Sequence, residues 1–371
     1  MMAESVLGRT LVGTVVLAGV LIAASLLGLA EFNSAVVTIF LTDVVAAVGL
    51  AVFMGNSGIL SFGHPAFMGL AAYVSGLASM NPVLRRATLT TFPHLLSGIS
   101  LPFWGGVCLA IGFVALFALT TGLAIVRLPR DAAAIATLGT LVIVNVVLVN
   151  ARSITNGSQT LYGVALTVGW RGALVVAVLC VTIARLYREA SAGLELRASR
   201  EDEVAAAALG INVRRRRLEA WVLSAIISAA AGVLLGHFLG AFSPAQFYLT
   251  LTITVVAMVI VGGETTVSGV VMGTILVTAV LQVLGNWEDG ASLGPIHIPA
   301  LLGLPTLGLS VVLVLAVYFR RQGLFGRQEL EFAVAGSARR RMSRRVRPGA
   351  REDVAEPLVD TSTEDVGVAK K

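Results

Sequence analysis

Residues that could take part in chemistry are few in this sequence, and the two most distinctive lie inside apolar stretches. Asp43 stands near the middle of an apolar run. An acid there costs ~2.5–3.5 kcal/mol on insertion scales, so it should face a bundle interior or a cavity. It is either a pathway residue or an acid hydrogen-bonded to Ser, Thr or His. The imidazole of His64, which precedes Pro65, could bond backbone groups that proline leaves free, or contact a solute.

Neutral hydrogen-bonding groups form a second set of candidates. They are carried by Thr137, Ser153, Thr155 and Asn156. Neutral donors and acceptors suit a solute pathway, because binding must be weak enough for release. Ser and Thr also join membrane helices to one another, and Thr137 fits that role as well.

Several classes of enzyme chemistry lack their residues here. The only lysines are Lys370 and Lys371, so the body of the chain has neither the lysine of a phosphate-binding loop nor a Schiff-base nucleophile. Cys108 and Cys180 are far apart, and the four histidines are scattered. A zinc site or a disulfide framework needs closer spacing or more cysteines. We therefore expect no metal and no cofactor in this chain.

The elements that must position these residues are apolar spans. Of the 371 residues, 56% are hydrophobic and 13% are charged, whereas soluble domains carry about 25% charged residues. A membrane helix needs about 20 apolar residues. We predict an all-α, polytopic membrane helix bundle of eight to ten transmembrane helices. The ten apolar runs are 11–30, 35–54, 59–79, 103–126, 133–150, 170–186, 218–240, 248–261, 267–285 and 300–319.

Two runs suggest irregular backbone. The 59–79 run contains several glycines and Pro65 and reads as a broken or re-entrant helix, while the 248–261 run is short. Irregular backbone at membrane depth requires surrounding protein or a water-lined cavity. The first run follows Arg9 and is longer than the apolar part of a usual signal peptide, so we expect it to be a retained helix.

Arginine sets the expected orientation. The dense segments are 127–130, 185–217 and everything from 320 onward. An N-terminus inside and ten crossings place all three in the cytoplasm, as the positive-inside rule requires. The outside exceptions are Arg85, Arg86, Arg152 and Arg171. We therefore predict a multi-pass membrane protein with its arginine-rich segments in the cytoplasm.

Two segments lie outside the spans. They are a cytoplasmic loop at 187–217, within a predicted membrane domain of residues 1–326, and a cytoplasmic tail at 327–371. We expect the tail to be disordered, since it lacks apolar periodicity. Its arginines suit anionic membrane lipid. The net charge of +6 is explained by topology, so we expect no nucleic acid partner.

Within the loop, a short helix is predicted from Glu201 to Leu209. Acids occupy its first turn, as the helix dipole favours, and Gly210 stands where a glycine usually ends a helix. Its alanines form a small face that another surface could approach closely. Two interpretations remain: an amphipathic linker lying on the membrane, or an element that docks into a partner.

Six stretches resemble, in order, the motifs of branched-chain amino acid ABC importer permeases. Gly55–Gly69 is similar to the G-x-x-G-x-x-S-x-G-H-x-x-F-x-G pattern, and Arg197–Ile211 to R-A-x-R-E-x-E-x-A-A-x-x-L-G-I. The second contains the family's E-A-A…G element, which inserts into a cleft of the ATPase subunit. The other matches are Ala134–Leu138, Ser153–Ser158, Gly262–Gly263 and Gly323–Gly326, so the resemblance covers residues 35–326.

The resemblance implies a permease subunit that imports a small polar solute, most simply a branched-chain or related amino acid. ATP would bind a separate ATPase, and further partners would be a second homologous permease and an extracytoplasmic solute-binding protein. The implied coupling residues are Arg197, Arg200, Glu201, Glu203, Ala205, Ala206 and Gly210. The implied pathway residues are Asp43, Ser61, Gly63, His64, Thr137, Ser153, Thr155, Asn156 and Gly157.

Departures from the family's pattern leave the substrate open. They fall at Ala51, at 129–132, at Val142 and at 263–270, and urea, an amide or another small solute is an alternative cargo. An ion-coupled secondary transporter should show paired intramembrane acids and bases, whereas Asp43 is nearly alone. A membrane enzyme would need a polar constellation at one depth, and the sequence shows none.

Overall fold

The computed structural model describes residues 2–89, 100–288, 292–293, 296–297 and 303–319. Helices dominate these residues, and the strands are two residues long. The helices are α1 (Met2–Glu31), α2 (Ser34–Ser57), α3 (His64–Ser79), α4 (Pro82–Thr88), α5 (Phe103–Ile125), α6 (Arg130–Asn150), α7 (Arg152–Thr155), α8 (Trp170–Glu189), α9 (Ser191–Glu201), α10 (Glu203–Ala208), α11 (Val213–Leu239), η1 (Pro244–Phe247), α12 (Leu249–Gly262), α13 (Val267–Glu288) and α14 (Leu304–Phe319). The strands are β1 (Leu161–Tyr162), β2 (Ala241–Phe242), β3 (Ser292–Leu293) and β4 (Ile296–His297).

Among the described residues, eight helical segments are long and apolar enough to cross a membrane. They are α1, α2, α5, α6, α8, α11, α12 together with η1, and α13. The shorter helices α3 and α14 occupy the other two predicted runs, each with 16 residues. The prediction of an all-α polytopic bundle is confirmed. The predicted tail at 327–371 and the Gly323–Gly326 motif lie outside the described residues.

The predicted break in the 59–79 run is present. Gly58 ends α2 with a φ of +70°, which glycine adopts without strain, and its N–H bonds the Met54 carbonyl. The chain then runs without helix to Gly63, and α3 begins only at His64, with Pro65 in its first turn. Pro suits that position because its missing N–H would have no helical partner there.

The 248–261 run forms one continuous helix, α12, and the irregular backbone lies just before it. Before α12 the chain forms the short helix η1, in which Ser243 and Gln246 cap each other's backbone. Helix α3 packs against η1, since a Cβ placed on Gly69 of α3 would lie 3.1 Å from the Cβ of Phe247. Protein therefore covers η1 at this contact, as irregular backbone in a membrane requires.

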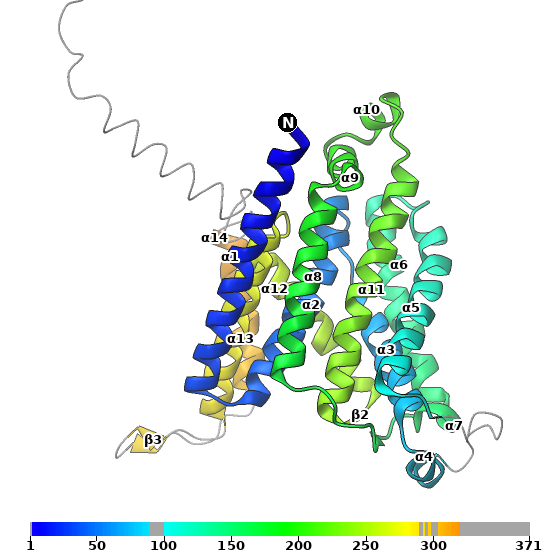
Figure 1. Cartoon of the computed structure of the whole chain (residues 1–371), viewed down its shortest axis with the longest axis vertical. Helices are drawn as coiled ribbons and strands as arrows, with labels where there is room; N and C mark the ends of the chain where they lie inside the picture. Colours follow the sequence, from blue (N-terminus) through cyan, green and yellow to red (C-terminus); the bar gives the residue numbers. More distant parts are fainter. Residues whose placement is uncertain (1, 90–99, 289–291, 294–295, 298–302, 320–371) are drawn as a thin grey trace, which may run out of the picture. The chain divides into compact units, whose positions relative to one another are not determined.

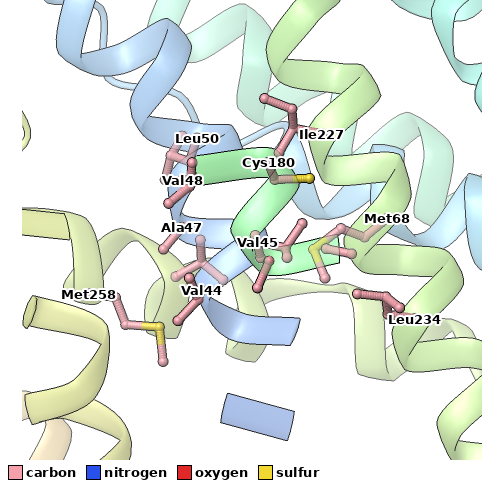
Figure 2. Packing of buried hydrophobic residues seen from close by; sticks show 14 of the residues in the cluster. Val44, Val45, Ala47, Val48, Leu50, Met68, Cys180, Ile227, Leu234 and Met258 are labelled. Carbon is pink, nitrogen blue, oxygen red and sulfur yellow. The ribbon is translucent and has the colours of Figure 1, made fainter. Parts of the chain in front are cut away.

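The core lies around α2 and α11, which pack against each other. Small residues allow the close approach: a Cβ at Gly49 of α2 would lie 2.8 Å from the Ser228 Oγ of α11. Apolar side chains of α2 fill the space between its neighbours (Figure 2). The labelled residues there are Val44, Val45, Ala47, Val48, Leu50, Met68, Cys180, Ile227, Leu234 and Met258.

Two arginine-rich segments meet at one end of the helices. Arg130, at the start of α6, donates to the Ser199 carbonyl of α9 at 3.0 Å. At the other end, β1 pairs antiparallel with β2, with Leu161 opposite Phe242. Figure 1 shows α9 and α10 at the first end, and α4, α7 and β2 at the second. Segments 127–130 and 185–217 therefore lie at the same end of the helices, as the predicted orientation requires. The third arginine-dense segment, from residue 320 onward, lies outside the described residues.

Candidate functional site

The predicted docking helix is two helices rather than one, which corrects its predicted start. Helix α9 ends at Glu201, and α10 begins at Glu203. Asp202 between them has extended backbone, and its Oδ1 accepts hydrogen bonds from the N–H groups of Val204 and Ala205 at 2.8 and 3.0 Å. Asp is a strong N-cap because its short side chain reaches these free donors. The sequence pattern of helix formers concealed this cap.

The predicted end of this helix is confirmed. Gly210 has a φ of +83°, a conformation that residues with a Cβ adopt with strain. Its N–H bonds the Ala207 carbonyl at 3.0 Å, and Ile211 N–H bonds the Ala206 carbonyl at 3.1 Å. This pair of bonds is the Schellman arrangement, which satisfies the last carbonyls of a helix.

The face of α10 that points outward carries more than alanine. Ala206 is buried, whereas Ala205 is exposed. Val204 and Leu209 are 80% and 83% exposed. Exposed apolar side chains at both ends of a short helix mark a surface for a partner or for lipid. The prediction from sequence had noted the alanines and missed these two larger residues.

Helix α10 is tied to the bundle through a carboxylate. Glu203 Oε2 accepts from Arg217 of α11 at 2.7 Å. The Arg217 side chain is buried and Glu203 is half exposed, so the ion pair is shielded from solvent on the bundle side only. Glu203 therefore links α10 to the start of α11, and through α11 to the core.

Helix α9 is tied to three other segments. Arg200 donates to the Gly55 carbonyl of α2 at 2.9 Å and forms a 2.6 Å ion pair with Glu264, in the turn between α12 and α13. Arg130 of α6 donates to the carbonyls of Ser199 and Arg200. Glu264 stands in a stretch where the sequence departs from its family's pattern, which is why its role was not anticipated.

Two further predicted coupling residues lie on α9: Glu201 is exposed at its end, and Arg197 bonds locally. Arg197 donates to the Arg188 carbonyl at the end of α8, at 3.0 Å. Nearby, Glu195 of α9 accepts two bonds from Arg216 of α11, at 2.7 and 3.1 Å. Helix α9 thus contacts α2, α6, α8 and α11 through charged side chains.

Of the predicted pathway residues, His64 is fully buried and bonded on both nitrogens. Its Nδ1 lies 2.9 Å from Ser61 Oγ, and its Nε2 lies 3.0 Å from Ser224 Oγ. The Ser224 hydroxyl donates to the Trp221 carbonyl at 2.8 Å, so it accepts from Nε2–H, and Nδ1 accepts from Ser61. The rings of Trp221 and Phe67 meet the imidazole edge to face.

Thr137 of α6 holds the interrupted backbone ahead of α3. Its Oγ1 accepts from Phe62 N–H at 3.1 Å and donates to the Ala134 carbonyl. A Cβ at Gly63 would lie 2.9 Å from the Thr137 carbonyl oxygen, so glycine permits the close approach. Ser61, Gly63, His64 and Thr137, predicted from separate motifs, are therefore brought together in one polar cluster.

The other predicted group forms a turn at the far end of α6. Thr155 Oγ1 donates to the carbonyls of Leu148 and Ala151, and accepts from Gly157 N–H at 3.3 Å. Asn156 adopts a φ of +66° and donates to the Thr160 carbonyl at 3.0 Å. Ser153 lies half-buried in the same turn. Leu148 is eleven residues along α6 from Thr137, about 16 Å, so the two groups are separate.

Asp43 stands apart from both groups. It lies on α2, half-buried, and forms no hydrogen bond or ion pair with any other described residue. The expected alternative of a hydrogen-bonded acid is thus not seen among the described residues. A carboxyl group without a partner at this depth is costly unless water or a ligand reaches it.

One polar surface was not anticipated. A hollow of about 430 Å³ lies on η1 and α12 and is lined by Ala245, Gln246, Thr250, Leu251 and Thr254. Thr250 and Thr254 lie one turn apart on α12, and Gln246 of η1 lines the same hollow, so the three polar residues form one stripe along it. Gln246 and Thr250 are exposed although they belong to a membrane-spanning segment. The four-residue spacing in the sequence was the signal that could have found them.

The described residues contain no group of three or more His, Cys, Asp or Glu side chains that could hold a metal ion. Among the side chains described above, the neutral polar groups form clusters, Asp43 stands alone on α2, and the ion pairs gather at one end of the helices. An interrupted multi-pass helix bundle of this kind is the architecture of a membrane transport subunit rather than of a soluble enzyme.

The chain belongs to the family described as branched-chain amino acid transport system / permease component, which matches residues 32–317. It is 27% identical to the high-affinity branched-chain amino acid transport system permease protein LivM of Escherichia coli K12 over 323 residues, which cover 78% of this chain and 69% of that protein. The LivM protein of Salmonella typhimurium is 26% identical over the same shares. A probable branched-chain amino acid transport permease protein LivH of Methanocaldococcus jannaschii is 36% identical over 28% of this chain and 34% of its own. No solved structure matches the chain.

Proposed function

We propose that this chain is the membrane-spanning subunit of an ABC importer that brings branched-chain amino acids across a bacterial cytoplasmic membrane. The family match and the two LivM relatives support the class of cargo. ATP would be bound and hydrolysed by a separate ATPase, because the body of the chain has no lysine for a phosphate-binding loop. The other partners would be a second homologous permease and an extracytoplasmic solute-binding protein.

The observation that carries this proposal is the exposed apolar face of α10 on a helix that is tied to the bundle. Val204 and Leu209 project outward, while Glu203 is paired with Arg217. A surface lipid anchor would need its apolar side chains at the membrane, with basic groups beside them. A docking element instead needs an apolar contact face and a stiff link to the part that moves, and α10 has both.

The contacts of α9 define how a push on α10 would reach the membrane. Arg200 connects α9 to the end of α2 through Gly55, and to the α12–α13 turn through Glu264. Closure of the ATPase subunits would shift α9 and α10 together and move these helix ends. Packed helices have discrete arrangements rather than continuous ones, so the shift would switch the bundle between outward and inward access.

The solute route would follow the neutral polar groups. The stripe of Gln246, Thr250 and Thr254 is open, whereas the cluster around His64 is closed by its own hydrogen bonds in this arrangement. Neutral groups bind an amino acid weakly enough for release. The predicted pathway residues near His64 and near Thr155 would then hold the non-helical backbone beside the solute route in place.

The proposal is tested by uptake of radiolabelled leucine into cells that lack their own branched-chain amino acid uptake and express this chain with its chromosomal neighbours. Uptake should require the complete set and should fall when ATP is depleted, but survive a protonophore while ATP is maintained. Competition by unlabelled isoleucine and valine, but not by urea or acetamide, is expected. Leucine uptake by the purified chain alone, driven by an ion gradient in liposomes, would instead identify a secondary transporter.

A further inference from the structure

A groove between α1, α2 and α13 has no role in the transport proposal. Its volume is about 220 Å³, and its walls are almost wholly apolar, among them Leu27, Val37, Phe40 and Ile275. The groove exists because α1 packs mainly on α8 and touches α13 at few points. An apolar groove that opens on the outside of a membrane bundle is a place for a hydrocarbon chain, because filling it removes a void from the packing.

One end of the groove is polar. Glu31 and Gln282 line it near the ends of α1 and α13. These ends lie together. Helix α13 starts near the Gly55 end of α2, because a Cβ on Gly55 would overlap the carbonyl of Glu264, just before α13. Helix α13 therefore ends near the start of α2, which is also where α1 ends. The polar end is thus remote from the arginine-rich segments of α9 and α10, in the outer leaflet of the orientation predicted from arginine.

The charged group at this end is an acceptor. Glu31 is exposed and makes no ion pair with a described residue. The Gln282 amide nitrogen donates to Asn286 Oδ1 at 3.1 Å, which leaves its carbonyl oxygen free to accept. Further along the groove, Thr278 Oγ1 is buried and has no hydrogen-bond partner. A ligand with a positively charged N–H donor beside a long apolar part complements the Glu31 carboxylate, the Gln282 carbonyl and the apolar walls.

We propose that this groove is a binding site for a phospholipid with a primary ammonium headgroup, that is, a phosphatidylethanolamine. One acyl chain would fill the apolar part, and the ammonium would donate to the Glu31 carboxylate and the Gln282 carbonyl. An amino acid such as leucine also has an ammonium and an apolar chain. Its carboxylate would lack a cationic partner, because the groove is lined by no Arg, Lys or His, whereas a lipid phosphate stays in the headgroup layer.

The site is tested on the full-length chain, purified in mild detergent, delipidated, and examined by native mass spectrometry. The probes are dioleoyl lipids with identical chains and ethanolamine, choline or glycerol headgroups. We expect about tenfold tighter binding of the ethanolamine lipid than of the choline lipid, since charge-assisted hydrogen bonds to N–H donors contribute about 1.5 kcal/mol or more. Equal binding of the three lipids would overturn the proposal.

Two variants separate the headgroup from the groove. Glu31→Gln keeps the shape of the side chain and should abolish the preference for ethanolamine while retaining acyl binding. Ala279→Phe fills the groove and should remove bound lipid, whereas Leu116→Phe, on a part of α5 that is 63% exposed, should not. Unchanged ethanolamine preference in Glu31→Gln contradicts the proposal. So does cross-linking of Ala279→Cys to a second permease subunit in native membranes, which would identify the groove as a protein interface.

Leucine is the final control. Added at saturating concentration, it should not displace the ethanolamine lipid, and displacement would show that the groove is a solute site instead. None of these measurements requires transport, so loss of the proposed uptake activity and loss of the lipid site are distinguishable results.

Discussion

The guanidinium of Arg200 lies 2.6 Å from the carboxylate of Glu264 and joins the loop helix α9 to the turn between two apolar helices, α12 and α13. The same guanidinium donates to the Gly55 carbonyl at the end of α2. One side chain therefore holds three segments that are distant in sequence. A displacement of α9 cannot leave both α2 and the α12–α13 turn in place without breaking a charged hydrogen bond.

Neutralising this contact should impair transport more than stability. Glu264→Gln removes the ion pair of a partly exposed group, so we expect a loss of about 0.5–1 kcal/mol in unfolding free energy, together with a severalfold fall in leucine uptake. Thermal unfolding in detergent and uptake in cells measure the two effects. The control is Arg215→Gln, which breaks an exposed ion pair with Glu219 that stays within one helix. Equal uptake in both variants would argue against a role for Glu264.

Replacing Gly210 should disturb the end of α10 through its backbone alone. A Cβ at this position meets no atom within 4 Å, but its φ is +83°. We expect Gly210→Ala to cost about 1 kcal/mol locally and to reduce uptake, while the protein still inserts. Gly139→Ala is the matched control, because Gly139 also has open space around it but lies in regular α6. If the two alanine variants behave alike, the left-handed glycine is not needed for coupling.

A charge on the outward face of α10 should prevent the ATPase from docking. Leu209→Asp places a carboxylate at the centre of the proposed contact, so we expect loss of the ATPase on co-purification and loss of uptake, with normal amounts of protein in the membrane. Val83→Asp makes the same kind of change at a residue that is 75% exposed on α4, at the opposite end. Retention of the ATPase by Leu209→Asp would favour the alternative of a lipid-anchored linker.

Water should reach the stripe on α12 but not the neighbouring face. In a background with Cys108→Ala and Cys180→Ala, we expect Thr250→Cys to react with a charged methanethiosulfonate in native membranes, and leucine to protect it. Ile253→Cys lies on the same helix, 50% exposed, and should react only with an apolar maleimide. Reaction of both cysteines with the charged reagent, or of neither, would exclude Thr250 from a solute route.

Removing the imidazole of His64 should destabilise the protein without changing its affinity for solute. His64→Leu leaves the hydroxyls of Ser61 and Ser224 without their partner, at a cost of about 2 kcal/mol or more. We expect a lower unfolding temperature and less protein, but an unchanged KM for leucine uptake. His64→Gln, which can keep one of the two bonds, should be intermediate. A raised KM at normal stability would instead place His64 in direct contact with the solute.

The class of this protein can be read from its residues in order. Apolar runs long enough to cross a membrane leave little choice other than a helix bundle, and the glycines and Pro65 within the 59–79 run located the interrupted helix correctly. Local backbone chemistry was equally readable at Gly210, because a glycine after a short run of helix formers usually ends the helix. These features depend on neighbours along the chain.

Tertiary structure decided which of those residues meet. Nothing along the chain indicates that Arg200 reaches Glu264, that Thr137 supports the backbone at Phe62, or that His64 is enclosed by Ser61 and Ser224. The open stripe on α12 and the groove beside α1 also depend on which helix faces remain uncovered after packing. Hydrophobic runs specify that helices form but not which faces pair, because side-chain shape and polar partners, rather than apolarity, discriminate between helix contacts inside a membrane.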